Sequence, residues 1–504
     1  MSVATTYTAQ GIISGSVPIT VEADINRGLH AFTVVGLAGK AIDEAKDRVS
    51  AAIKNSGYPA PKSQNHKITI SLSPADVKKE GPLFDLPIAV AYLLAAAEIT
   101  TDKKKRMFIG ELSLNGELRP VRGALLIAQI AQANGYTEII LPEANACEAA
   151  LVENIAVYGA KTLKEVIEHI SPEKDTQNIV AAPVSVISDT WHEGAIQLED
   201  IKGQEQAKRG LLIAAAGRHN VIMVGPPGTG KTMLARAFQN LLPPLSRADA
   251  LAVTAIRSIA GELGGVVSSQ PPFRAPHHTA SHTALVGGGS NPRPGEVTLA
   301  HKGVLFADEF PEFERRSIDA LRQPLEDRIV TISRVQGTAV FPADFILVAA
   351  MNPYRGTEDG STNYAASMME TYKGKISGPI LDRIDLWLPV PHVDYETLTK
   401  TSGEAGETAR ARANIVNARQ RMGERLDGRD ITTNAEMSAR DIEDTIELTD
   451  DVKEILKAAS QKLNLSPRSY HRVIKVARTI ADLDDQETIA AAHLYEALQY
   501  RIPV

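Results

Sequence analysis

A glycine-rich loop after a short apolar stretch is the feature that most constrains the fold of this 504-residue chain. The stretch Val221-Ile-Met-Val runs into Gly225-Pro-Pro-Gly-Thr-Gly-Lys-Thr, and a helical pattern starts near Met233. This is the G-x-x-x-x-G-K-[ST] pattern in its strand–loop–helix setting. The glycines let backbone N–H groups curve around phosphate oxygens, and the helix N-terminus adds partial positive charge. The sequence therefore predicts an α/β domain that binds a nucleoside triphosphate.

The residues of this loop have separate expected roles. The Lys231 amine would reach the β- and γ-phosphates, and the Thr232 hydroxyl would bind Mg²⁺. We therefore expect ATP and Mg²⁺ as cofactors. The cofactor-binding residues predicted from the loop are Gly225, Pro226, Pro227, Gly228, Thr229, Gly230, Lys231, Thr232 and Met233.

Two later apolar stretches end in polar residues that suit hydrolysis. Gly303-Val-Leu-Phe-Ala precedes Asp308 and Glu309. Asp308 would hold Mg²⁺, and Glu309 would act as general base on the attacking water. The stretch Phe345-Ile-Leu-Val-Ala-Ala-Met ends at Asn352, whose amide could orient that water. A turn residue before proline is the competing interpretation of Asn352.

The length of the chain predicts about three domains. Residues before about 170 alternate β-rich runs, such as Lys67–Leu72, with apolar helical ones, such as Leu86–Ala97. Polar residues and prolines then suggest a linker. The pattern after about residue 395 is helical. We thus expect a multidomain α/β protein divided into residues 1–170 (α+β), 171–195 (linker), 196–395 (P-loop α/β core with a parallel sheet) and 396–504 (helical lid).

Charge and composition exclude several classes of protein. The 54 basic and 61 acidic residues give a net charge of 54 − 61 = −7, so bulk charge does not favour coating nucleic acid. The single cysteine, Cys147, excludes an intrachain disulfide and a multi-thiolate zinc site. The N-terminus lacks the pattern of a signal peptide. The most apolar stretch has twelve residues and contains Pro87, whereas a spanning helix needs about 20. We expect a cytoplasmic protein without a membrane segment.

Several longer strings resemble a known family. They include Phe273-Arg-Ala-Pro-His-His-Thr-Ala-Ser, Arg322-Gln-Pro-Leu-Glu-Asp, Ser377-Gly-Pro-Ile-Leu-Asp-Arg-Ile-Asp and Tyr470-His-Arg-Val-Ile-Lys. Together with the loop, these strings are similar to the magnesium-chelatase-like branch of the AAA+ ATPases, and within it to the ComM (YifB) subfamily. The resemblance covers nearly the whole chain.

The resemblance implies a hexamer with ATP sites between subunits. It assigns Arg383 as an arginine finger that acts on the neighbouring subunit, although an ion pair with Asp382 or Asp385 is the competing interpretation. It assigns Asn352 as sensor 1 and Arg468 as sensor 2 on the helical lid. It also places Gly203 and Gln204 near the adenine. The implied catalytic residues are Lys231, Glu309, Asn352, Arg383 and Arg468.

The first domain resembles the Lon-protease fold. Leu83 and Leu125 stand where that family has its catalytic serine and lysine. Two leucines supply neither a nucleophile nor an amine. We therefore expect no peptidase activity, and interpret residues 1–170 as an inactive ring platform or a surface for a protein partner.

The ComM subfamily is associated with ATP-driven DNA unwinding and branch migration in recombination and natural transformation. The related helicases insert two hairpins into the channel of the ring. The corresponding segments here are Ala284–Glu296 and Val330–Phe341, with Arg293 and Arg334 as candidate DNA contacts. Solvated loop arginines are the competing interpretation. Two other functions stay open: a motor subunit that remodels a protein partner, as in magnesium chelatase, and an ATP-gated scaffold.

The sequence departs from the family at two places. Residues 353–371 contain no cysteine, so we do not expect the zinc ribbon that many members carry. Lys375 stands where the family often has arginine. Separately, His277, His278 and His282 form a cluster in which two imidazoles are four residues apart, as ligands on one helix face would be. Pro276 precedes the cluster, however, and no carboxylate or thiolate within it completes a metal site.

Overall fold

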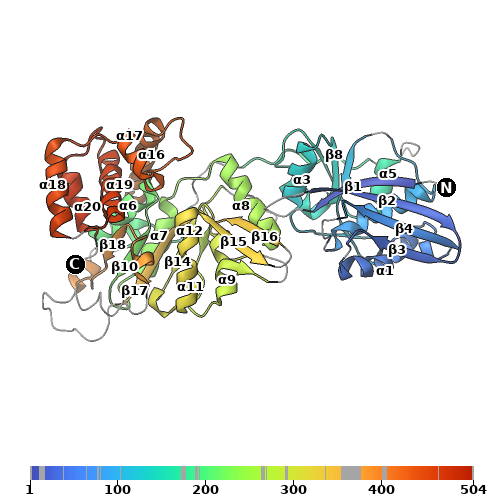
Figure 1. Ribbon diagram of the computed structural model, residues 1–504, viewed down its shortest axis with the longest axis horizontal. Helices are drawn as coiled ribbons and strands as arrows, with labels where there is room; N and C mark the ends of the chain where they lie inside the picture. Colours follow the sequence, from blue (N-terminus) through green and yellow to red (C-terminus); the bar gives the residue numbers. More distant parts are fainter. Residues whose placement is uncertain are drawn as a thin grey trace. The chain divides into compact units, whose positions relative to one another are not determined.

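The chain divides into two compact units in a computed structural model (Figure 1), and each unit is described by itself. The first unit comprises Met1–Ser188 and Ala250–Ser268, and the second comprises Asp189–Asp249 and Ser269–Val504. The structure describes residues 3–10, 17–37, 39–63, 65–75, 79, 81–102, 104–171, 178–187, 191, 193–262, 267, 269–289, 293–334, 337–352, 376–399, 406–463 and 465–501. Among these residues, none of the helices combines the length and apolar character that crossing a lipid bilayer requires.

A four-stranded sheet forms one part of the first unit. Its strand order is β1-β2-β4-β3, with β3 parallel to β4 and the other pairs antiparallel. The predicted strand at Lys67–Leu72 lies within β4, and the predicted helix at Leu86–Ala97 is α2, which ends at Ala95. Ten of the eleven α2 residues are buried, which explains the apolar sequence that follows Asp85. The elements are β1 (Val3–Gln10), β2 (Val17–Arg27), β3 (Ala31–Val35), α1 (Lys40–Asn55), β4 (His66–Ser73) and α2 (Asp85–Ala95).

A three-stranded parallel sheet, ordered β5-β8-β9, completes this unit with a small antiparallel pair, β6 and β7. All five residues of β8 are buried, as expected for a strand covered on both faces. The elements are β5 (Arg106–Phe108), β6 (Glu111–Leu112), β7 (Leu118–Arg119), α3 (Ala124–Ala133), β8 (Glu138–Pro142), α4 (Ala146–Ala149), β9 (Ala156–Ala160) and α5 (Leu163–Ile170).

Helix α8 (Arg247–Ala260) follows the P-loop helix in the sequence, yet from Ala250 onward its residues belong to the first unit. The Ser258 hydroxyl accepts a hydrogen bond from the backbone N–H of Gly123 at 3.0 Å. Gly123 has φ +78° and is the N-cap residue of α3, so the contact lies at the start of that helix. The sequence pattern carried no signal for this exchange, because an amphipathic helix does not specify the surface that covers it.

The second unit contains a five-stranded parallel sheet of order β11-β14-β17-β10-β18. The residues of β14 and β17 are all buried, as their unbroken apolar sequences predict. The carboxyl ends of parallel strands meet at one edge, and their amino ends at the other. The sheet elements and the two helices next to β10 are α6 (Glu205–Gly217), β10 (Val221–Val224), α7 (Lys231–Leu241), β11 (Phe273–Arg274), β14 (Val304–Ala307), β17 (Ile346–Met351) and β18 (Leu386–Pro389).

Helices at the end of the chain form a bundle that packs on α6 through α16 and α19, drawn in orange and red in Figure 1. A continuous apolar core joins this bundle to the sheet, from Val221 and Val348 to Ile415 and Val473. The buried Asp482 binds Arg425 at 2.6 Å and Arg478 at 3.0 Å within it. The bundle helices are α16 (Glu407–Arg425), α17 (Ala439–Thr445), α18 (Asp450–Lys462), α19 (Pro467–Leu483) and α20 (Ala491–Gln499).

Two insertions extend from the sheet. The first contains α9 (His282–Val286), β12 (Gly287–Gly288), β13 (Arg293–Pro294) and α10 (Glu296–Leu299). The second is an antiparallel hairpin of β15 (Ile329–Arg334) and β16 (Gly337–Pro342). A Cβ built on Gly287 would lie 3.3 Å from the Ile332 side chain, so the two insertions touch. The remaining helices are α11 (Arg315–Ala320), α12 (Arg322–Asp327), α14 (Gly378–Leu381) and α15 (Tyr395–Thr399).

Asp344, just before β17, forms ion pairs with three cationic side chains at the amino edge of the sheet. Its carboxylate lies 2.9 Å from Lys302, 3.1 Å from Arg218 and 3.7 Å from Arg328. Burial raises the pKa of the Asp344 carboxyl, but the three cations outweigh this effect and hold the pKa well below its usual range. The ionised carboxylate therefore stabilises the fold at neutral pH.

Replacement of this carboxylate, Asp344→Asn, is expected to lower the free energy of unfolding at pH 7 by about 3 kcal/mol, because Arg218 loses its described carboxylate partner, while Lys302 and Arg328 keep Asp249 and Glu436. Above the unfolded pKa of about 4 the wild-type contribution is fully present, and it is lost as the pH falls toward the lower folded value. Urea unfolding at pH 7 and at pH 3 checks both points. The difference in the free energy of unfolding between wild type and variant should be smaller at pH 3. The exposed Asp327→Asn is the control. A gap of the same size at both pH values would contradict the assignment.

Candidate nucleotide site

The P-loop joins β10 to α7 with the tight geometry that its glycines allow. Gly228 and Gly230 have φ of +80° and +92°, which side chains rarely tolerate. Gly225 lies so close to β18 that an added Cβ would stand 2.0 Å from the carbonyl oxygen of Val390. Helix α7 begins at Lys231, two residues before the predicted start. Its first turn therefore opens directly onto the loop.

Lys231 connects the loop to the neighbouring strand. Its amine donates to the carbonyl oxygens of Gly225 and Pro226 at 2.6 and 2.8 Å, and to Asn352 Oδ1 at 2.9 Å. Burial lowers the pKa of Lys231, and the charge of Asp308 opposes that shift. The structure thus brings Lys231 and Asn352 together, with the ammonium group held by neutral oxygens that phosphate oxygens can replace.

Thr232 and Asp308 meet beside this lysine. The Thr232 hydroxyl donates to Asp308 Oδ2 at 3.2 Å. One residue comes from the start of α7 and the other follows β14, so both lie at the carboxyl edge of the sheet. Hydroxyl and carboxylate oxygens are the protein ligands that suit Mg²⁺ in phosphate sites. The residues present therefore fit this ion and a nucleotide phosphate.

Glu309 adopts an unusual backbone conformation at the same edge. Its φ is +50°, which is rare for a residue with a side chain, and its N–H donates to Asp308 Oδ1 at 2.9 Å. Its carboxylate lies 3.0 Å from His278 Nδ1. Backbone conformations of this kind cost energy and cluster at functional sites. The Glu309 carboxylate therefore lies at the carboxyl end of β14, in contact with the His278 imidazole.

His278 is the residue of this site that sequence reasoning missed. It follows β11, the parallel neighbour of β14, so the topology brings it to the carboxyl edge. The helix-face spacing considered for His278 and His282 is wrong, because α9 begins only at His282. The His277 and His278 rings instead lie 4.2 Å apart. No group of three or more metal-ligating side chains forms among the residues that the structure describes.

Gly203 and Gln204 lie next to the loop. Both have positive φ, +64° and +62°. The Gln204 side-chain amide donates to the Pro391 carbonyl oxygen at 2.7 Å and lies 3.5 Å from that of Thr229, a loop residue. A Cβ on Gly203 would stand 3.3 Å from Val393. These residues and Val393 form a partly apolar wall beside the loop. Met233 is partly exposed on α7.

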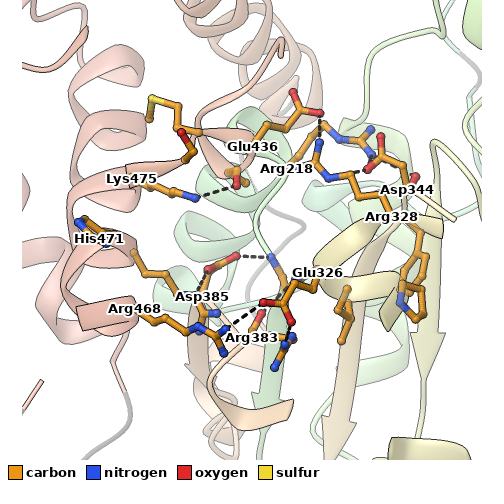
Figure 2. A pocket seen from close by; sticks show the side chains of 18 of the residues that line it. Arg218, Glu326, Arg328, Asp344, Arg383, Asp385, Glu436, Arg468, His471 and Lys475 are labelled. Atoms are coloured by element: carbon orange, nitrogen blue, oxygen red, sulfur yellow. Dashed lines mark hydrogen bonds and ion pairs between the residues drawn. The ribbon is translucent and has the colours of Figure 1, made fainter. Parts of the chain in front are cut away.

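Arg383 and Arg468 lie at the opposite, amino edge of the sheet. The Asn220 side chain, which precedes β10, donates to the Arg383 carbonyl oxygen at 3.1 Å. A strand of four residues spans about 13 Å, which separates this edge from Lys231. Arg468 Nη2 lies 2.9 Å from Glu326 Oε1, and Arg383 pairs with the same carboxylate (Figure 2). The two arginines therefore converge on Glu326, at the opposite end of the sheet from the P-loop of their own chain.

The ion-pair partner of Arg383 differs from the predicted alternatives. Sequence proximity suggested Asp382 or Asp385, whereas the side chain binds Glu326, 57 residues away. Asp385 instead pairs with Arg472 at 3.3 Å. Burial raises the pKa of the Asp385 carboxyl, but the neighbouring His219 ring and the charge of Arg472 keep that pKa below its usual range.

The candidate DNA contacts lie in the two insertions. Arg293 is exposed in β13. The backbone of Arg334 ends β15, opposite Gly337, and its side chain lies outside the described residues. The cysteine-free segment 353–371 and Lys375 also lie outside them.

A parallel sheet with this phosphate loop, an acidic pair after a strand two positions away from the P-loop strand and a C-terminal helical bundle define an AAA+ ATPase of the magnesium-chelatase type. Family models described as magnesium chelatase subunit ChlI match residues 197–398 and 21–145, and one for its C-terminal part matches residues 405–501. The competence protein ComM of Haemophilus influenzae is 41% identical over 512 residues, which cover 100% of this chain and 98% of that protein. The chain belongs to the magnesium-chelatase-like ComM (YifB) family, whose AAA+ class generally uses ATP and Mg²⁺.

Two further relatives differ in extent. YifB of Escherichia coli is 41% identical over 508 residues, covering 99% of this chain and 97% of that protein. DNA replication licensing factor MCM3 homolog 1 of Zea mays is 28% identical over 237 residues, covering 46% of this chain and 27% of that protein. The first likeness extends over both units, and the second over less than half of the chain.

Proposed function

We propose that this chain is a hexameric AAA+ motor that hydrolyses ATP and moves along DNA in recombination or natural transformation. One observation carries the proposal. The loop, Asp308 and Glu309 lie at the carboxyl edge of the sheet, whereas Arg383 and Arg468 lie at the amino edge. A complete hydrolytic site therefore needs two copies of the chain.

The residues at the carboxyl edge have distinct roles in this proposal. Bound Mg–ATP supplies the γ-phosphoryl group that is transferred to water. Lys231 exchanges its carbonyl partners for phosphate oxygens, and Thr232 and Asp308 hold the ion. Glu309 takes the proton of the attacking water as general base. Asn352, already bonded to Lys231, orients that water. Gly203 and Gln204 form the side of the site nearest the adenine.

The residues at the amino edge serve the neighbouring copy. A guanidinium supplied in trans offsets the charge that develops on the transferred phosphoryl group. Arg383 and Arg468 converge on one carboxylate, so both can converge on one phosphate group of a neighbour. Head-to-tail interfaces of this kind form a closed ring when the rotation between neighbours closes. A hexamer is the ring size that the family resemblance implies.

The DNA substrate rests on the two insertions and on the relatives. Arg293 is exposed on the insertion that packs against the β15–β16 hairpin at Ile332, so Arg293 and Arg334 come from adjoining elements. Arginines on adjoining loops can follow phosphates without reading sequence. One relative is named for competence and another for DNA replication. These observations support DNA over a protein substrate.

The first unit is proposed to be a platform without peptidase activity. Leu125 is fully buried in α3, and Leu83 packs partly buried against the core. Neither side chain can act as a nucleophile or a base. Because the unit incorporates α8, which follows the P-loop helix, it is connected by chain to the nucleotide site. A protein partner could act on the motor through this unit.

The test is the steady-state ATPase rate with single-stranded, duplex and four-way-junction DNA. We expect DNA to raise the rate severalfold, with the largest effect naming the preferred structure. Arg293→Ala is expected to remove about one phosphate contact and so reduce the salt dependence of stimulation. Arg440→Ala, a change of an 89% exposed lid arginine, is the matched control and should change neither quantity.

A rate that is indifferent to every DNA would contradict the DNA motor. It would leave the ATPase chemistry intact and favour one of the two other functions considered, the remodelling of a protein partner as in magnesium chelatase. A partner protein that binds the first unit would then be expected to change the ATPase rate when it is added.

A further inference from the structure

A cavity of about 510 Å³ lies at the amino edge of the sheet, and Glu326 is one of the residues that line it (Figure 2). Six Arg and Lys side chains and four Asp and Glu side chains line it. Glu326 lies near the end of α12, and 49% of its side chain is exposed. Its two carboxylate oxygens bind separate partners, Oε1 with Arg468 and Oε2 with Arg383. One carboxylate thus joins the two arginines that the proposed function assigns to a neighbour's phosphate.

Of the other acids of the cavity, Asp385 and Asp344 lie at the sheet edge, and Glu436 pairs with Arg328 at 2.7 Å. Asp385 accepts the backbone N–H of Asn220 at 3.0 Å and pairs with Arg472. Asp344 holds the three cations described above, and 12% of its side chain is exposed. Glu326 is more exposed, and its described ion pairs are those with Arg383 and Arg468. These contacts can therefore open without separating the strands.

Arg383 is held in a position from which it cannot serve a neighbour. Only 9% of its side chain is exposed. Nη1 donates to the Pro379 carbonyl oxygen at 2.6 Å, Nη2 binds Glu326, and Nε has no acceptor among the described residues. A buried donor without an acceptor costs free energy. The buried state therefore depends on Glu326, and Arg383 must turn outward to reach a phosphate on another chain.

We propose that Glu326 is a built-in competitor for Arg383 and Arg468, which it holds in the free chain and releases to the triphosphate at a neighbour's P-loop when the ring assembles. The inference rests on the proposed function, because it needs the two arginines to act between copies. A triphosphate offers more charge and more acceptor oxygens than one carboxylate. When it is present, it therefore displaces Glu326 as the partner of the two arginines. Without nucleotide on the neighbour, the arginines gain no new partner when they leave Glu326. Glu326 thus makes assembly depend on a nucleotide-loaded neighbour.

The experiment measures ATPase rate per chain against protein concentration for wild type and Glu326→Gln. The variant keeps the shape of the side chain and removes its charge. Two partly exposed ion pairs are worth a three- to tenfold effect, so we expect the concentration for half-maximal rate to fall by about that factor. Asp327→Asn removes the adjacent exposed charge on α12 and should leave the midpoint unchanged. Sedimentation without nucleotide should show larger species for Glu326→Gln than for wild type.

Three results would overturn the inference. The first is an unshifted midpoint. The second is a lower plateau rate in Glu326→Gln, which would make Glu326 a residue that positions the arginines inside the ring. The third is a fall in the urea midpoint for unfolding of Glu326→Gln relative to wild type. Such a fall would attribute the lower concentration for half-maximal rate to a destabilised fold. If Arg383→Ala leaves the plateau rate unchanged, the proposed function itself fails. That variant therefore separates the failure of the proposed function from failure of the competitor alone.

Discussion

Glu309→Gln is expected to lower the ATPase rate about a thousandfold while nucleotide binding stays close to wild type. General-base catalysis by a positioned carboxylate contributes about 10²–10⁴ in rate. The amide has nearly the same shape, so the contact with His278 at 3.0 Å can persist as a hydrogen bond. The binding residues Lys231, Thr232 and Asp308 are untouched. The change should therefore separate turnover from binding.

Two measurements check this expectation. Steady-state phosphate release gives the rate, and titration calorimetry with ATP gives the dissociation constant. Glu314→Gln, which alters an exposed acid five residues further along the chain, is the matched control and should keep the full rate. If Glu309→Gln kept more than a tenth of the wild-type rate, the general base would lie elsewhere, and His278 would be the next residue to replace.

The strands and the phosphate loop could be predicted because their signals are local. An unbroken apolar run indicates a strand buried on both faces, and β14 and β17 are such strands. Spacing along the chain then placed Asp308, Glu309 and Asn352 at strand ends. Parallel pairing brings those ends to one edge, so the meeting of Lys231 with Asn352 follows from the topology.

The contacts that were missed join residues far apart in sequence. Glu326 lies 57 residues from Arg383 and 142 from Arg468, and nothing in the local pattern selects it over neighbouring acids. His278 required the position of β11 next to β14. Helix α8 has an amphipathic pattern that fits any apolar surface, so its membership of the first unit needed the tertiary structure. Pairings of this kind depend on the whole fold and carry no short-range signal.

Arg383→Ala is expected to lower the ATPase rate at least a hundredfold, and Lys231→Ala is expected to do the same for a different reason. An arginine finger is worth about 10³–10⁵ in rate in related phosphoryl transfer. Lys231 acts at the carboxyl edge of its own chain, and Arg383 lies across the sheet from it. If each site combines the loop of one chain with the arginine of the next, the two defects fall in different halves of the site.

Mixing the two inactive variants therefore distinguishes a shared site from one contained in a single chain. In a randomly mixed ring, about a quarter of the interfaces pair an intact Lys231 with an intact Arg383, so activity should return to a substantial fraction of wild type. Each variant mixed with itself supplies the control and should stay inactive. If activity does not return, either both residues act in a site within a single chain or the chains do not form a ring. Since Arg383 is buried against Glu326 in the free chain, recovery would also show that assembly draws it out.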